Sequence, residues 1–150
     1  MLRENIQKDV IAAMKAGDKE RTATLRLITA KIKDRDIEQR TATSVPDDDD
    51  LVQDVLLKMA KQRRESIQMY DEGGRQELAD KERAELSVIE EFLPRQMDEG
   101  ETKAAIAQVK TDLGADSMKD MGRVMAELKA RHGASLDMSI TSGLVKAALQ

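Results

Sequence analysis

The sequence contains no cysteine and no tryptophan, and its 150 residues include one phenylalanine and one tyrosine. The missing thiols exclude a disulfide framework, a cysteine nucleophile and a zinc finger, and they fit a reducing compartment. Two prolines and eight glycines leave few breaks, and alternating β-branched runs bounded by turn signals are absent. We therefore predict an all-α fold with an aliphatic core of Leu, Ile, Val, Ala and Met.

Long apolar runs are also missing from the chain. No stretch approaches the roughly 20 apolar residues that span a bilayer. The opening MLRENIQKDV carries charges at Arg3 and Glu4, which argues against a signal peptide. We therefore expect a soluble, cytoplasmic protein with no membrane partner.

Charge of both signs is abundant and nearly balanced, with a net value of −4. The excess of acid lies in residues 1–100, whose balance is −5, whereas residues 101–150 have a balance of +1. A net negative chain repels phosphate, which argues against nonspecific binding of polyanions. The second half of the chain is the part better suited to contact RNA.

Apolar residues recur at helical spacing in the first two thirds of the chain. The acidic run DDDD at 47–50 lacks the spacing, glycine and distal glutamate of an EF-hand. We interpret it as negative charge that stabilises the start of a helix through the macrodipole. Glycines and prolines supply the stop signals, and together these patterns predict helices over 2–16, about 19–40, 47–72 and 75–92.

The two longest predicted helices are joined at Gly73–Gly74, which predicts an antiparallel hairpin. The stretch LPRQM, with Pro94, is a candidate joint between two parts. Beyond it, three shorter helices are predicted, and two of them begin with the spacing of a capping box. We therefore predict an N-terminal helical domain over 1–94 that contains the hairpin, followed by a small three-helix domain over 97–150.

The segment DSMKDMGRVMAELKARHG, residues 116–133, has methionines at helical spacing and several cations. Glycine inside a helix costs roughly 1 kcal/mol relative to alanine, so a packing reason is expected for Gly122. We expect that its missing side chain lets a neighbouring helix approach closely. Lys119 and Arg123 fall on a different face, which is either a solvated surface or a partner surface. Five side chains of this predicted helix fall within an arc of about 80°, and we predict that they form a core stripe rather than a ligand site. They are Met118, Met121, Met125, Leu128 and His132.

Several distinct strings, namely KQRRESI, GGRQELA, LPRQ, SMKDMGRVM and the ending SGLVKAAL, resemble the YqeY-like proteins. The resemblance covers essentially the whole chain in the right order. It implies a helical N-terminal domain and a three-helix tail shared with GatB, a subunit of the tRNA-dependent amidotransferase. There the tail helps to hold tRNA, so the resemblance implies a link to carbon–nitrogen ligation with glutamine as amido donor.

The sequence shows no catalytic constellation for such a reaction. It has no glycine-rich phosphate loop, no serine in a strand–turn–helix context, and one histidine, His132, without an evident partner. We identify no catalytic residue, no metal ligand and no cofactor site. These observations favour a non-catalytic accessory over an autonomous enzyme, with the link to ligase activity implied by the resemblance alone.

Two functions stay open at this point. The first is an RNA-contacting module, with tRNA as the expected ligand, which would read phosphate and shape because aromatic stacking groups are scarce. The second is a helical protein-interaction module that docks on a synthetase, an amidotransferase subunit or another helical partner. The candidate RNA-binding residues are Lys119, Arg123, Lys129, Arg131 and Lys146 in the tail, and Lys58, Lys61, Arg63 and Arg64 in the string KMAKQRR.

Overall fold

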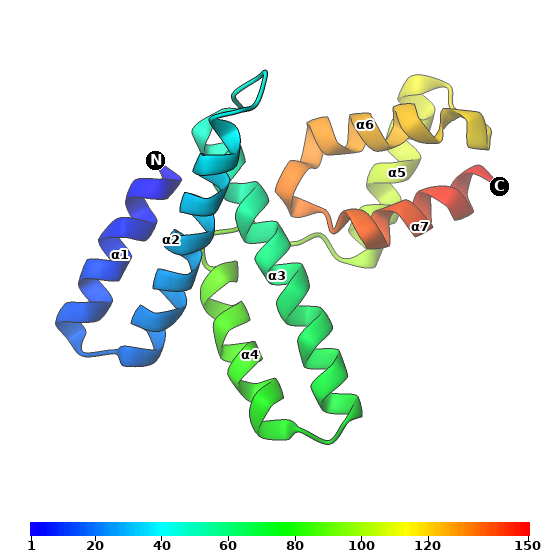
Figure 1. The fold of residues 1–150 in the computed structure, drawn as a ribbon. Coiled ribbons are helices and arrows are strands. Elements are labelled where there is room, and N and C mark those ends of the chain that lie inside the picture. Colours follow the sequence, from blue (N-terminus) through cyan, green and yellow to red (C-terminus); the bar gives the residue numbers. More distant parts are fainter. The chain divides into compact units, whose positions relative to one another are not determined.

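The computed structural model describes residues 1–150, and every regular element in it is helical (Figure 1). The predicted all-α class is therefore confirmed. The contacts divide the chain into two compact units, Met1–Leu93 and Pro94–Gln150, called here unit 1 and unit 2. None of the helices combines the length and the apolar character needed to cross a membrane.

Unit 1 contains four helices, and local signals set their ends. Gly17 ends the first helix in the left-handed conformation, at φ 72°, which glycine adopts without steric cost. Asp18 then caps the second by accepting a hydrogen bond from the Arg21 amide. Asp47 caps the third through the Asp49 amide. The helices are α1 (Leu2–Ala16), α2 (Lys19–Gln39), α3 (Asp48–Glu72) and α4 (Gln76–Glu90).

The helices of unit 1 bury one aliphatic core. α3 and α4 run antiparallel from the turn at Gly73–Gly74, and α1 and α2 pack beside them (Figure 1). Burying a large aliphatic side chain contributes roughly 1.5–3 kcal/mol, which makes this core the main source of stability. The fully buried large side chains are Ile6, Leu25, Ile28, Val52, Leu56 and Ile89.

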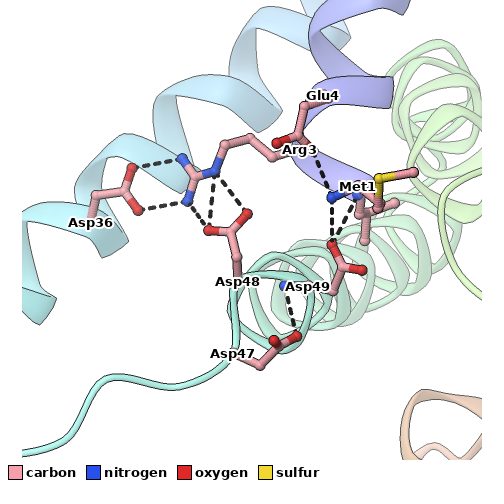
Figure 2. A network of polar contacts seen from close by, with 8 residues as sticks. Met1, Arg3, Glu4, Asp36, Asp47, Asp48 and Asp49 are labelled. Atoms are coloured by element: carbon pink, nitrogen blue, oxygen red, sulfur yellow. Dashed lines mark hydrogen bonds and ion pairs between the residues drawn. The ribbon is translucent and has the colours of Figure 1, made fainter.

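The acidic run at the start of α3 does more than interact with the helix dipole (Figure 2). Asp48 accepts hydrogen bonds from Arg3 of α1 at 2.8 and 3.2 Å. The same guanidinium forms two bonds with Asp36 of α2, at 2.8 and 2.9 Å. Asp49 accepts a bond of 2.9 Å from the Leu2 amide, so the acidic run ties together three helices of unit 1.

Unit 2 contains α5 (Glu99–Leu113), α6 (Met121–His132) and α7 (Met138–Leu149), with the 3₁₀ turns η1 (Met118–Asp120) and η2 (Gly133–Ser135). Asp98 caps α5, and Ser117 and Asp120 form a capping box at η1, as their spacing indicates. Asp137 caps α7. The large buried aliphatic side chains of this unit are Ile106, Val109, Val124, Leu128, Leu136, Val145 and Leu149.

The predicted methionine stripe is only partly a core stripe. Met118 lies in the 3₁₀ turn and is 40% exposed, so the prediction that it is buried is wrong. Met121 and Met125 are partly buried against the core. Val124 and Leu128 are the fully buried side chains of α6. Met118 thus precedes α6, whose buried face is formed by Val124 and Leu128.

Candidate functional site

The side of η1 and α6 that faces away from the core carries cations and small residues. Val124 and Leu128 point into unit 2, which leaves the opposite side of the helix to solvent. On a helix, residues three or four apart share a face. The exposed residues on this side are Lys119, Gly122, Arg123, Ala126, Lys129 and Ala130, and we call them the outer face of α6.

Gly122 belongs to this outer face rather than to a helix contact. A Cβ atom placed on Gly122 would meet no other atom within 4 Å. The expectation that its missing side chain admits a neighbouring helix is therefore wrong. Together with Ala126 and Ala130, it instead leaves a smooth, exposed strip between longer basic side chains.

The cations of the outer face differ in whether an acid neutralises them. Arg123 donates to Asp120 at 2.6 Å. The Arg123 hydrogen bond, followed by the Asp116 amide, holds the pKa of Asp120 below its usual value. No carboxylate lies within 4 Å of Lys119 or Lys129. Two of the three charges are thus free to meet an anionic ligand.

The other two predicted tail residues lie elsewhere in unit 2. Arg131 points toward α5 and bridges Asp112 and Glu127, at 2.7 Å to each. Its hydrogen bond is the largest cause of the lowered pKa of Asp112. Lys146 is exposed on α7, with no carboxylate partner. The outer face of α6 therefore brings together Lys119, Arg123 and Lys129, while Arg131 is held by structural ion pairs.

The second predicted patch, KMAKQRR on α3, is largely neutralised across the hairpin. Arg63 contacts Glu85 at 3.0 Å and Glu82 at 3.4 Å on α4. Arg64 contacts Glu90 at 3.3 Å, and Lys58 lies 3.7 Å from Asp54 of its own helix. Lys61 is exposed and is the one cation of the four without a carboxylate partner.

No group of three or more His, Cys, Asp or Glu side chains is placed to bind a metal ion. His132, the single histidine, is partly buried at the end of α6. Its position beside Gly133, at the carbonyl end of a helix, suits a structural role. The structure brings no acid, base or nucleophile beside it through a hydrogen bond or ion pair.

One surface of unit 2 is not apparent from the sequence. A groove of about 500 Å³ runs between α5 and α7. On its α5 side, the Lys110 ammonium donates to the Ala148 carbonyl in the last turn of α7, at 2.7 Å. The lining residues are Lys103, Ile106, Ala107, Lys110, Thr111, Leu144, Ala147 and Ala148.

The sequence of the chain is similar to one protein family and to several curated proteins. The chain matches the family described as Yqey-like protein over residues 3–149. The protein named "Altered inheritance of mitochondria protein 41, mitochondrial" from Eremothecium gossypii is 33% identical over 59% of this chain and 47% of the relative. The protein of that name from Kluyveromyces lactis is 31% identical over 72% of this chain and 58% of the relative.

A third relative of the same name, from Lachancea thermotolerans, is 29% identical over 73% of this chain and 58% of the relative. The matched region thus spans about half the length of these curated relatives. The names of these relatives describe them as mitochondrial proteins.

Proposed function

The chain belongs to the YqeY-like family, and from that membership we propose that it is a non-catalytic accessory that contacts tRNA in tRNA-dependent amidation. The outer face of α6 is the observation that carries this proposal. It combines exposed cations, two of them unpaired, with a strip of glycine and alanine. Such a surface suits a phosphate backbone, because small residues allow close approach and lysines supply counter-charge.

The mode of binding follows from what the face contains. It has no aromatic side chain on which a base could stack, and the whole chain has one Phe and one Tyr. Contacts would therefore run to phosphate and sugar and depend on RNA shape rather than on base edges. Binding of this kind weakens steeply as salt rises, because each neutralised phosphate releases counterions.

The link to amidation rests on the resemblance of unit 2 to the tail of GatB. In this proposal the chain helps to position a tRNA, while glutamine hydrolysis and amide formation take place on a partner such as an amidotransferase. Its own contribution would be electrostatic attraction and orientation.

Cell fractionation, with detection of the chain in each fraction, tests the expected cytoplasmic location.

The proposal is tested by titrating tRNA into the purified protein at about 50 and 200 mM salt. We expect binding that falls at the higher salt, and that is lost in the variant Lys119→Glu/Arg123→Glu. The variant Lys58→Glu/Lys61→Glu is the matched control on α3. It should bind nearly as well as the wild type, because Asp54, Glu85 and Glu90 already neutralise three of the four cations of KMAKQRR.

An absence of binding by the wild type at low salt would overturn the RNA function. The alternative function, a helical protein-interaction module, is favoured by a separate observation. The groove between α5 and α7 is lined mainly by aliphatic side chains, which suit an apolar protein surface better than a phosphate backbone.

A further inference from the structure

The α5–α7 groove differs in character from the rest of this acidic chain. Its walls and floor are aliphatic apart from Thr111 and two lysines, and no acid lines it. Lys103 and Lys110 are thus the only charged residues that line the groove, although acids outnumber basic residues in the whole sequence, 29 to 25. The groove therefore selects for both apolar surface and negative charge.

Small side chains create the depth of the groove. Ala107 on α5 and Ala147 on α7 are both exposed, while Ile106 and Leu144 form a deeper apolar surface between them. Ile140, one turn before Leu144 on α7, is 60% exposed and extends the apolar strip. Binding of a partner that covers this aliphatic surface is favourable, because it removes apolar side chains from water.

The two lysines have a regular spacing along one edge of the groove. Lys103 and Lys110 are seven residues apart on α5, so their Cα atoms lie about 10.5 Å apart along the helix axis. Lys110 has one bond, to a backbone carbonyl, and no carboxylate partner. Lys103 pairs with Glu99 at 3.0 Å, but both side chains are well exposed, and such pairs contribute little in water.

We propose that the α5–α7 groove binds an acidic amphipathic helix from a partner protein. The apolar stripe of that helix, with side chains at i, i+4 and i+7, would cover Ala107, Leu144 and Ile140. Carboxylates about seven residues apart, at the edge of its stripe, would face Lys103 and Lys110. This helix-in-groove arrangement uses apolar burial for affinity and charge for orientation. The site goes beyond the proposed tRNA contact, because it lies on elements other than α6.

The test uses two synthetic 18-residue peptides that share one leucine stripe and differ in their flanking charges. One peptide has glutamates beside the stripe, and the other has lysines at the same positions. Each is titrated into the full chain labelled with ¹⁵N and followed by NMR. We expect the glutamate peptide to bind at least tenfold more tightly than the lysine peptide, with shifts confined to the amides of α5 and α7.

Two exposed alanines supply a matched pair of variants. Ala147→Trp fills the groove and should abolish binding of the glutamate peptide. Ala126→Trp adds the same bulk to the outer face of α6, where it should weaken tRNA binding but leave peptide binding unchanged. Lys103→Glu, at an exposed position, should weaken binding of the glutamate peptide about tenfold. This variant replaces Ala147→Trp as the test if circular dichroism shows that Ala147→Trp does not fold.

Several results would overturn the proposal. They are an absence of binding by the glutamate peptide, equal binding of the two peptides, or binding that neither Ala147→Trp nor Lys103→Glu weakens. Perturbation of the groove amides by tRNA, or a dimer held by the groove in sedimentation, would assign the surface to RNA or to a second copy instead. The tRNA titrations of the wild type and of Ala126→Trp report on the proposed function separately.

Discussion

Arg3 and Asp36 face each other through two parallel hydrogen bonds of 2.8 and 2.9 Å, which join α1 to α2. The same guanidinium also bonds Asp48 at the start of α3. These hydrogen bonds raise the pKa of Arg3, with Asp36 as the largest cause. Bidentate contacts of this kind favour one geometry of the two partners, so one arginine links three helices of unit 1.

Replacing this arginine should destabilise unit 1. In Arg3→Met the apolar stem is retained, but Asp36 and Asp48 lose their shared counter-charge. Because both acids are partly exposed, we expect a loss of only about 1 kcal/mol in the free energy of unfolding, measured by urea denaturation. Lys8→Met on α1, where no carboxylate lies within reach, is the control and should change stability by less than about 0.5 kcal/mol.

The same contacts predict how stability depends on pH. The Arg3 hydrogen bond holds the pKa of Asp36 below its usual value. The Leu2 amide, and then the terminal ammonium, do the same for Asp49. Below about pH 4 the unfolded chain binds more protons than the native state, so this stabilisation is present above that pH and lost as pH falls through the native pKa values.

Denaturation midpoints measured from pH 6 down to pH 2.5 check this sign. The wild type should lose stability progressively below about pH 4. Arg3→Met should show a shallower loss, because Asp36 no longer has the lowered pKa. Identical pH profiles for the two proteins would show that Asp36 does not contribute to acid sensitivity.

Two glycines of unit 2 should respond to alanine with opposite signs. Gly122 lies inside α6, in open space and at a negative φ, so Gly122→Ala should stabilise the fold by about 0.5–1 kcal/mol. Gly114 ends α5 at φ 63°, where a Cβ atom is strained, and Gly114→Ala should destabilise by about 1 kcal/mol. Thermal unfolding of both variants measures the difference, and equal signs would contradict the assigned backbone geometry.

Shortening a core side chain of α6 should weaken unit 2. Leu128 is fully buried among aliphatic neighbours, so Leu128→Ala should cost about 2–5 kcal/mol. Hydrogen exchange should show the loss of protection in α5, α6 and α7. Met118→Ala is the control, and its exposed side chain should give a change below about 0.5 kcal/mol.

Helix positions could be predicted well from the sequence because their signals are local. The stretch 2–16 ends at Gly17 as expected, and the last helix begins at Met138 after a capping aspartate. Side-chain exposure was predicted less well. Met118 falls within the predicted core stripe, yet it is 40% exposed, because periodicity identifies a face without revealing how much of it a neighbour covers.

Charge neutralisation across helices is the other feature that the sequence does not reveal. The string KMAKQRR has four cations and no acid, which suggests a basic patch. In the fold, Glu82, Glu85 and Glu90 come to it from α4, and each lies 19 to 26 positions along the chain from its partner. Similarly, the α5–α7 groove depends on which alanines meet across two helices, and that pairing is a tertiary property.

All three arginines of unit 2 are paired with acids, whereas Lys103 is the one lysine of this unit that has a carboxylate partner. Arg95, Arg123 and Arg131 are each held by a nearby acid, whereas Lys119, Lys129 and Lys146 have no such partner. Acetylation removes the charge of a lysine and leaves arginine unchanged. A lysine acetyltransferase could therefore lower the positive potential of this surface step by step, without breaking an ion pair that stabilises the fold.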